Sequence, residues 1–154
     1  MNKEGLISAL VSLTIISIVL VAVISSVIQN KKMIGPVMII FGFIPWIPLI
    51  LSERGIKSTG ADIIFGIMDT GPLAIAALVG AEYAGILGAI VGGAVGDSIT
   101  DGFAGVFEGK FSEYLRQHGI EEARTSLSSS MGKMSGCLLG AGTTLTIAWT
   151  VLGL

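Results

Sequence analysis

Residues 61–109 read ADIIFGIMDTGPLAIAALVGAEYAGILGAIVGGAVGDSITDGFAGVFEG, two long apolar runs that meet at the short segment Ala81-Glu82-Tyr83. A helix needs about 20 apolar residues to cross the hydrocarbon core of a bilayer, and each run is close to that length. Because the joining segment is so short, the two helices must fold back on each other. The sequence therefore predicts two membrane spans, residues 61–79 and 84–109, as a tight antiparallel hairpin. Pro72 is expected to interrupt the hydrogen-bond ladder of the first of them.

Three further apolar runs predict spans over residues 6–28, 33–51 and 134–152, with a cytoplasmic loop over residues 110–130. The fourth helix is expected to continue into the start of this loop, as far as Gly119. Pro45 and Pro48 are expected to kink the second span. The first run is longer than the roughly 7–15 apolar residues of a signal peptide, which indicates a retained span. Only 13% of the 154 residues are charged, against about 25% in soluble domains. We therefore expect an all-α, polytopic integral membrane protein, a single domain of about five transmembrane helices over residues 1–154.

The distribution of lysine and arginine predicts the orientation, because short cytoplasmic loops are enriched in these residues. With the N-terminus in the cytoplasm, only Lys31 and Lys32 lie outside. The expected location is thus the cell membrane, with the N-terminus cytoplasmic. The basic residues then on the cytoplasmic side are Lys3, Arg54, Lys57, Lys110, Arg116, Arg124 and Lys133.

Glycines recur every fourth residue in two of the predicted spans. Gly88, Gly92 and Gly96 share one helical face, and a second such series is Gly132, Gly136 and Gly140. Small residues at this spacing allow helix backbones to approach closely in lipid. The pattern predicts helix packing, either within the chain or between copies of it.

Acidic residues inside the predicted hairpin are the main functional signal. They are costly in a bilayer and commonly mark ion or proton pathways. With the turn at Glu82 and a rise of about 1.5 Å per residue, Asp69 is expected level with Asp97 near mid-membrane. Asp62 is then expected level with Asp101, nearer the cytoplasm, and Glu108 at the exit. Neither span contains a basic residue to neutralise these acids.

Two chemistries fit facing carboxylates. One is a shared cation, held by carboxylate oxygens, with Asp69 and Asp97 as tentative ligands of a divalent metal ion. The other is a shared proton, because each carboxylate disfavours ionisation of its neighbour. The alternative is that the acids only cap helices or accept hydrogen bonds, foremost Asp62 and Asp101 near the interface.

Other side chains suggest no further chemistry. A single cysteine, Cys137, excludes an internal disulfide and is expected to be a small packing residue. Met131 and Met134 are expected in packing, and His118 in solvent. A net charge of −2 gives no support for nucleic-acid binding. No phosphate-binding loop or nucleophile motif is present. We therefore expect neither an enzyme nor a resident cofactor.

The stretch GIMDTGPLAIAALVGAEYAGILGAIVGGAVGDSITDGFAGVFEGKFSEYL, residues 66–115, resembles the first helical hairpin of the vacuolar iron transporter family. In this resemblance Asp69 matches the first-helix aspartate and Asp97 the second-helix acid. It implies exchange of a divalent metal ion against protons by a dimer. This chain differs in having two spans before the hairpin, a loop without methionine after it, and glycine in place of the second-helix methionine.

Two functional hypotheses follow, with a structural scaffold as the third possibility. The first is a small cation or proton transporter or channel that works as a homo-oligomer. The second is a non-catalytic membrane subunit of a larger energy-converting complex, such as a hydrogenase or an ion pump, in which the acids line part of an ion path. In the scaffold reading, the acids bond only to neighbouring hydroxyls.

Overall fold

The fold was analysed in a computed structural model, which describes residues 3–52, 59–120 and 125–154. These residues are almost entirely helical and contain no strand, which confirms the all-α prediction. The elements are α1 (Lys3–Val27), α2 (Lys31–Gly42), α3 (Trp46–Leu51), α4 (Gly60–Gln117), α5 (Ser126–Thr146) and the π-helical turn η2 (Ile147–Val151).

Four stretches of the described chain are long and apolar enough to cross a membrane, by length and composition. The count differs from the five predicted spans because the third and fourth belong to one 58-residue element, α4. The four stretches are Leu6–Val27, Lys31–Leu51, Gly60–Gln117 and Ser126–Val151.

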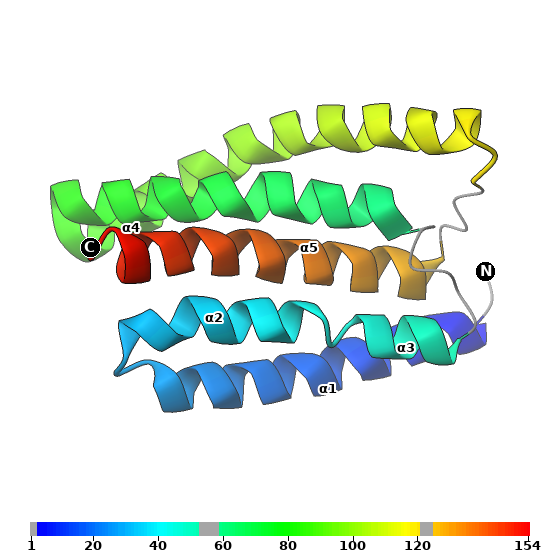
Figure 1. The fold of residues 1–154 in the computed structure, drawn as a ribbon, viewed down its shortest axis with the longest axis horizontal. Helices are drawn as coiled ribbons and strands as arrows, with labels where there is room; N and C mark the ends of the chain where they lie inside the picture. Colours follow the sequence, from blue (N-terminus) through cyan, green and yellow to red (C-terminus); the bar gives the residue numbers. More distant parts are fainter. Residues whose placement is uncertain (1–2, 53–58, 121–124) are drawn as a thin grey trace.

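The α4 element is a helical hairpin, whose arms fold back antiparallel (Figure 1). Non-helical backbone angles occur within it only at Ala84 and Gly85, where φ of Gly85 is +56°. The turn therefore lies just after the predicted segment Ala81 to Tyr83, at a glycine that tolerates this conformation. Helical geometry continues through Pro72, whose missing N–H leaves a gap in the hydrogen-bond ladder without ending the helix. We call residues 60–83 the inner arm, which lies against α5, and residues 86–117 the outer arm.

Glycine contacts hold the two arms together. A Cβ atom added to Gly88 would lie 1.9 Å from the backbone oxygen of Gly80, and one added to Gly92 would lie 2.5 Å from that of Ala76. Gly96 faces Ala76 and Leu73 in the same way. The predicted glycine face of the fourth span is thus a packing face within the chain.

Helix α5 is the centre of the bundle and contacts both the hairpin and α2 (Figure 1). Its glycine series packs on the inner arm: a Cβ atom on Gly136 would lie 2.1 Å from the backbone oxygen of Ile63. On its other side Ser135 donates to the backbone oxygen of Gly42 at 2.6 Å and accepts from Trp46 Nε1 at 2.9 Å. Helix α1 forms the far layer, and half of its large apolar side chains are exposed.

The kink predicted in the second span is present, because α2 ends at Gly42 and α3 begins after Pro45. The segment over residues 110–130, predicted as a cytoplasmic loop that opens with a continuation of the fourth helix, is largely helical in its described residues. Helix α4 runs on to Gln117, and α5 begins at Ser126 rather than near residue 134. Thr125 starts α5 with a capping box, in which its hydroxyl and backbone N–H pair reciprocally with Ser128. Of the described residues in this loop, only 118–120 and 125 lie outside the helices.

Candidate functional site

Asp69 is buried between the two arms of α4, with 9% of its surface exposed. Thr100 of the outer arm, itself buried, donates to Asp69 Oδ1 at 2.8 Å. The neighbouring Thr70 hydroxyl lies 3.5 Å from Oδ2. A buried carboxylate needs such donors, because burial without hydrogen bonds is costly. Asp69 therefore faces Thr100, which lies one turn beyond the Asp97 with which the sequence predicted it to be level.

Asp97 lies one turn before Thr100 on the outer arm, and its side chain is exposed. It borders a shallow groove of about 470 Å³ between the arms, together with Thr70, Leu73 and Gly93. Thr70 thus contacts both the buried Asp69 and the groove beside Asp97.

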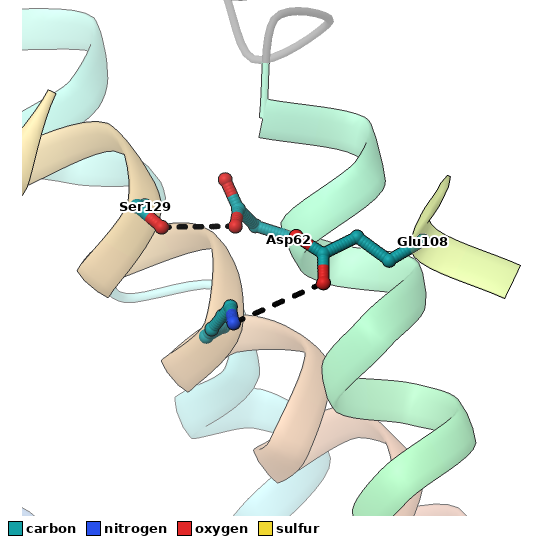
Figure 2. Close-up of polar contacts among 4 residues, drawn as sticks. Asp62, Glu108 and Ser129 are labelled. Carbon is teal, nitrogen blue, oxygen red and sulfur yellow. Dashed lines mark hydrogen bonds and ion pairs between the residues drawn. The ribbon is translucent and has the colours of Figure 1, made fainter. Parts of the chain in front are cut away.

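Asp62 and Glu108 form a second polar layer, near the start of α5 (Figure 2). Asp62 is 2% exposed and accepts a hydrogen bond from Ser129 Oγ at 2.9 Å. Glu108 reaches toward α5 from the outer arm, and its Oε2 lies 4.0 Å from Lys133 Nζ. Asp62 is therefore level with Glu108, and the predicted depth match of Asp62 with Asp101 is wrong.

Lys133 is the functional residue that sequence reasoning missed. The expected loop placed it among the cytoplasmic charges, whereas in α5 it pairs with Glu108 and lies 3.9 Å from the centre of the Phe65 ring. The sequence signal was the capping box at Thr125 and Ser128, which starts α5 early enough to include Lys133. The hairpin acids thus obtain a cation from a neighbouring helix.

Asp101 continues a row of residues spaced by four on the outer arm, which begins with Gly93 and Asp97 at the groove between the arms. We call this row the outer face; it consists of Gly93, Asp97, Asp101, Gly105 and Gly109. Both aspartates are exposed. A Cβ atom added to any of the three glycines would meet no atom within 4 Å. In the described part of the chain, the carboxylates of Asp97 and Asp101 accept no hydrogen bond and form no ion pair.

No three histidine, cysteine, aspartate or glutamate side chains among the described residues are grouped to hold a metal ion. Asp69 and Asp97, the tentative ligands, therefore do not form a complete metal site within one chain. Met131 is fully buried in the core with Leu49 and Leu127, and His118 is exposed beside Tyr114. Cys137 is half-buried beside Thr70. The side chains that remain for ion chemistry are the acids and the hydroxyl groups next to them.

These residues form three sets with different chemical capacities. The layer of Asp62 and Glu108 contains one lysine, whose positive charge offsets one of the two carboxylates. Asp69 is held by hydroxyl donors that can also pass a proton. The outer face carries two carboxylates without a protein partner, which are free to bind a cation or a proton. Comparisons with protein-family models, curated proteins and solved structures found no match to this chain.

Proposed function

We propose that this chain is an integral protein of the cell membrane that carries cations or protons along the acids of the α4 hairpin, as a homo-oligomer. One observation carries the proposal: in the described part of the chain, the exposed carboxylates of Asp97 and Asp101 have no hydrogen bond or ion pair, although both lie within a long apolar helix. Large apolar side chains, Ile90, Ile99 and Phe103 among them, are exposed on the same arm. Carboxylates directed at lipid are strongly unfavourable, and acids within spans usually mark pathways.

The depth of Asp97 strengthens this argument. Asp97 lies twelve residues beyond Gly85, which places it about 18 Å from the hairpin tip along a straight helix. If the tip lies at the membrane surface, this is near the middle of a hydrocarbon core of about 30 Å. The carboxylate of Asp97 is therefore too deep to reach water at a membrane surface by displacement of its side chain. A second protein surface or a bound cation is required.

A second copy of this chain suits the outer face. Gly93, Gly105 and Gly109 leave the helix backbone open on that side, and small residues at this spacing permit close helix pairing. A two-fold pair is self-complementary, because the same patch serves both subunits. It would bring two copies of Asp97 and Asp101 together. Four carboxylates provide the oxygen ligands that hard divalent cations prefer, or positions for shared protons.

The path that we propose runs from the outer face to the cytoplasmic end of the hairpin. It passes from Asp97 by way of Thr70 to Asp69, and then to the layer of Asp62 and Glu108, about 10 Å further along the helix. The ammonium group of Lys133 in that layer would repel a cation arriving along the path and so separate the path from the cytoplasm. The orientation, with the N-terminus in the cytoplasm, rests on the distribution of lysine and arginine.

A different membrane subunit would cover the same face equally well in physical terms, which is the complex-subunit alternative. Native mass spectrometry of the protein extracted in mild detergent from its own membrane separates the two. A homo-oligomer alone supports the transporter proposal. Co-extraction of other membrane subunits in fixed ratio contradicts it and assigns the face to those subunits.

Ion flux into proteoliposomes tests the function directly. Liposomes containing the protein and an indicator for protons or for Mn²⁺ receive the corresponding gradient. We expect flux above that of empty liposomes, and its loss in Asp97→Asn and in Asp69→Asn. The matched control is Glu113→Gln, an exposed acid of α4 outside the pathway, which should leave flux unchanged. Equal flux in all variants with intact oligomers would support the scaffold reading instead.

A further inference from the structure

A deep groove lies at the hairpin end of the bundle, away from the acids. It has a volume of about 750 Å³, within the range of about 300–1,000 Å³ typical of small-molecule sites. One wall comes from the inner arm near its tip and the other from the end of α5 and from η2. The walls are formed mainly by Ile75, Leu78 and Val79 on one side and by Ile147, Ala148 and Trp149 on the other.

The π-helical turn shapes the second wall. Leu152 donates its backbone N–H to the oxygen of Ile147 at 2.9 Å, five residues back, so the turn is wider than an α-helical turn. Three consecutive residues, Ile147 to Trp149, border the groove as a result. Such turns are frequent at binding sites. The wall is thus a local departure from regular helix that creates apolar space.

Among the described residues around this groove, charged side chains lie at its tip end. Glu82, at the hairpin tip, borders it on one side. On the other side Leu154 borders it, and Lys31 Nζ donates to the backbone oxygen of Leu154. Thr150 Oγ1 also donates to the backbone oxygen of Lys32, at 3.4 Å, which holds the start of α2 near this rim. The mouth therefore has a carboxylate on one rim and an ammonium on the other.

The apolar part extends toward the middle of the bundle. Ile75 lies seven residues before Glu82, about 10 Å deeper along the helix. Trp149, at the mouth, is of the residue type enriched at membrane surfaces. A molecule that matches this arrangement has a zwitterionic head and an apolar chain, in the orientation of a bilayer lipid.

We propose that this groove binds one phospholipid with an ammonium-bearing headgroup. One acyl chain lies between the inner arm and η2, the phosphate contacts Lys31, and the ammonium contacts Glu82. The site uses none of the acids assigned to the ion path. Its test therefore succeeds or fails independently of ion transport.

Tryptophan fluorescence gives a direct test, because the chain has only two tryptophans, Trp46 and Trp149. In Trp46→Phe, the remaining signal reports the groove. The protein in mild-detergent micelles is titrated with a phosphatidylethanolamine brominated on its acyl chains, which quenches by contact. We expect saturable quenching, and weaker binding of the equally brominated diacylglycerol, which has no headgroup. Lys31→Gln should weaken phospholipid binding about fivefold, in line with the attraction of one lysine to a lipid phosphate.

Val79→Phe fills the groove, whereas Val91→Phe makes the same change on the outer arm; the two valines are 50% and 53% exposed. Native mass spectrometry of the chain with both tryptophans counts retained phospholipid, and serves if Trp46→Phe fails to fold. We expect one lipid per chain, lost in Val79→Phe and kept in Val91→Phe. Equal quenching by diacylglycerol, or retention of lipid in Val79→Phe, would overturn the proposal. So would a change of oligomeric state in Val79→Phe if the unsubstituted protein retains no lipid.

Discussion

The inner and outer arms of α4 carry the same kinds of residue in opposite environments. On the inner arm, Asp62 and Asp69 are buried, and each accepts a hydrogen bond from a hydroxyl of another helix or arm. On the outer arm, Asp97 and Asp101 are exposed, and Asp97 borders the groove between the arms. The inner acids are therefore part of the packing of one chain. The outer acids are explained only by something outside it.

Glycines divide in the same way, on two faces of a single helix. Gly88 and Gly92 are pressed against the backbone of the inner arm, whereas Gly105 and Gly109 have open space above them. One spacing rule, a small residue every four positions, thus describes both a filled interface and an empty one. The same kind of substitution, made once on each face, therefore measures how much each face contributes to the stability of the chain.

The largest effect is expected for Gly88→Ala. Its new Cβ atom would lie 1.9 Å from the backbone oxygen of Gly80, and neither backbone can move without opening the hairpin. We expect a loss of about 3 kcal/mol in the free energy of unfolding, at the upper end for overpacking. The measurement is unfolding by titration with a denaturing detergent. Gly109→Ala is the control and should be neutral or slightly stabilising, since alanine favours helix; similar losses in both would remove the distinction between the faces.

Thr100→Val should have the next largest effect. It removes the close donor to the buried Asp69 while keeping the volume of the side chain. Hydrogen bonds between membrane helices contribute up to about 1.7 kcal/mol, and the carboxylate acceptor places this one near that limit. Ser98→Ala is the matched control, because its exposed hydroxyl bonds only to the carbonyl of Ala94 one turn earlier. Equal stability of Thr100→Val and the unsubstituted protein would mean that Asp69 is satisfied otherwise.

The sequence was sufficient to predict the hairpin but not its register. Length, apolar composition and a short turn leave two adjacent spans no alternative to antiparallel packing. The depth match failed because the turn lies at Ala84 and Gly85 rather than at Glu82. A turn between Ala84 and Gly85 lies two to three residues beyond Glu82 and changes the residue opposite any position by about five, so the position opposite Asp62 moves from about residue 102 to about residue 107, next to Glu108. Only the backbone angle of Gly85 reveals this.

The partners of the acids were harder to predict for a related reason. Hydroxyl and lysine partners come from α5 and from the opposite arm, and their identity depends on helix rotation as well as on depth. Ser129 and Lys133 are four residues apart on α5, and the predicted loop concealed that shared face. The exposure of Asp97 and Asp101 could not be predicted from the acids themselves, because their spacing does not reveal which side of the helix packs.

Lys133→Met tests the layer of Asp62 and Glu108 and should have a smaller effect. It removes the contact with Glu108 at 4.0 Å and the contact with Phe65, but Lys133 is 40% exposed, so solvent screens the pair. We expect a loss of about 1 kcal/mol in unfolding free energy. Lys133→Arg should retain most of it, and Lys110→Met should change little. A loss in Lys133→Met as large as that in Gly88→Ala would show that the layer is essential to folding.

The smallest effect on the chain itself is expected for Gly105→Leu on the outer face. No atom lies within 4 Å of the added Cβ position, so the unfolding free energy of the single chain should change by less than about 0.5 kcal/mol. The same substitution should lower the dimer fraction sharply, because a leucine holds apart two backbones that a glycine lets meet. Sedimentation in density-matched detergent measures both states over a range of protein-to-detergent ratios. Phe103→Leu, which changes an exposed apolar side chain outside the row of small residues, is the control and should leave the dimer intact. If Gly105→Leu alters neither stability nor assembly, lipid covers this face, and Asp97 must then be neutralised by a bound proton or cation within a single chain.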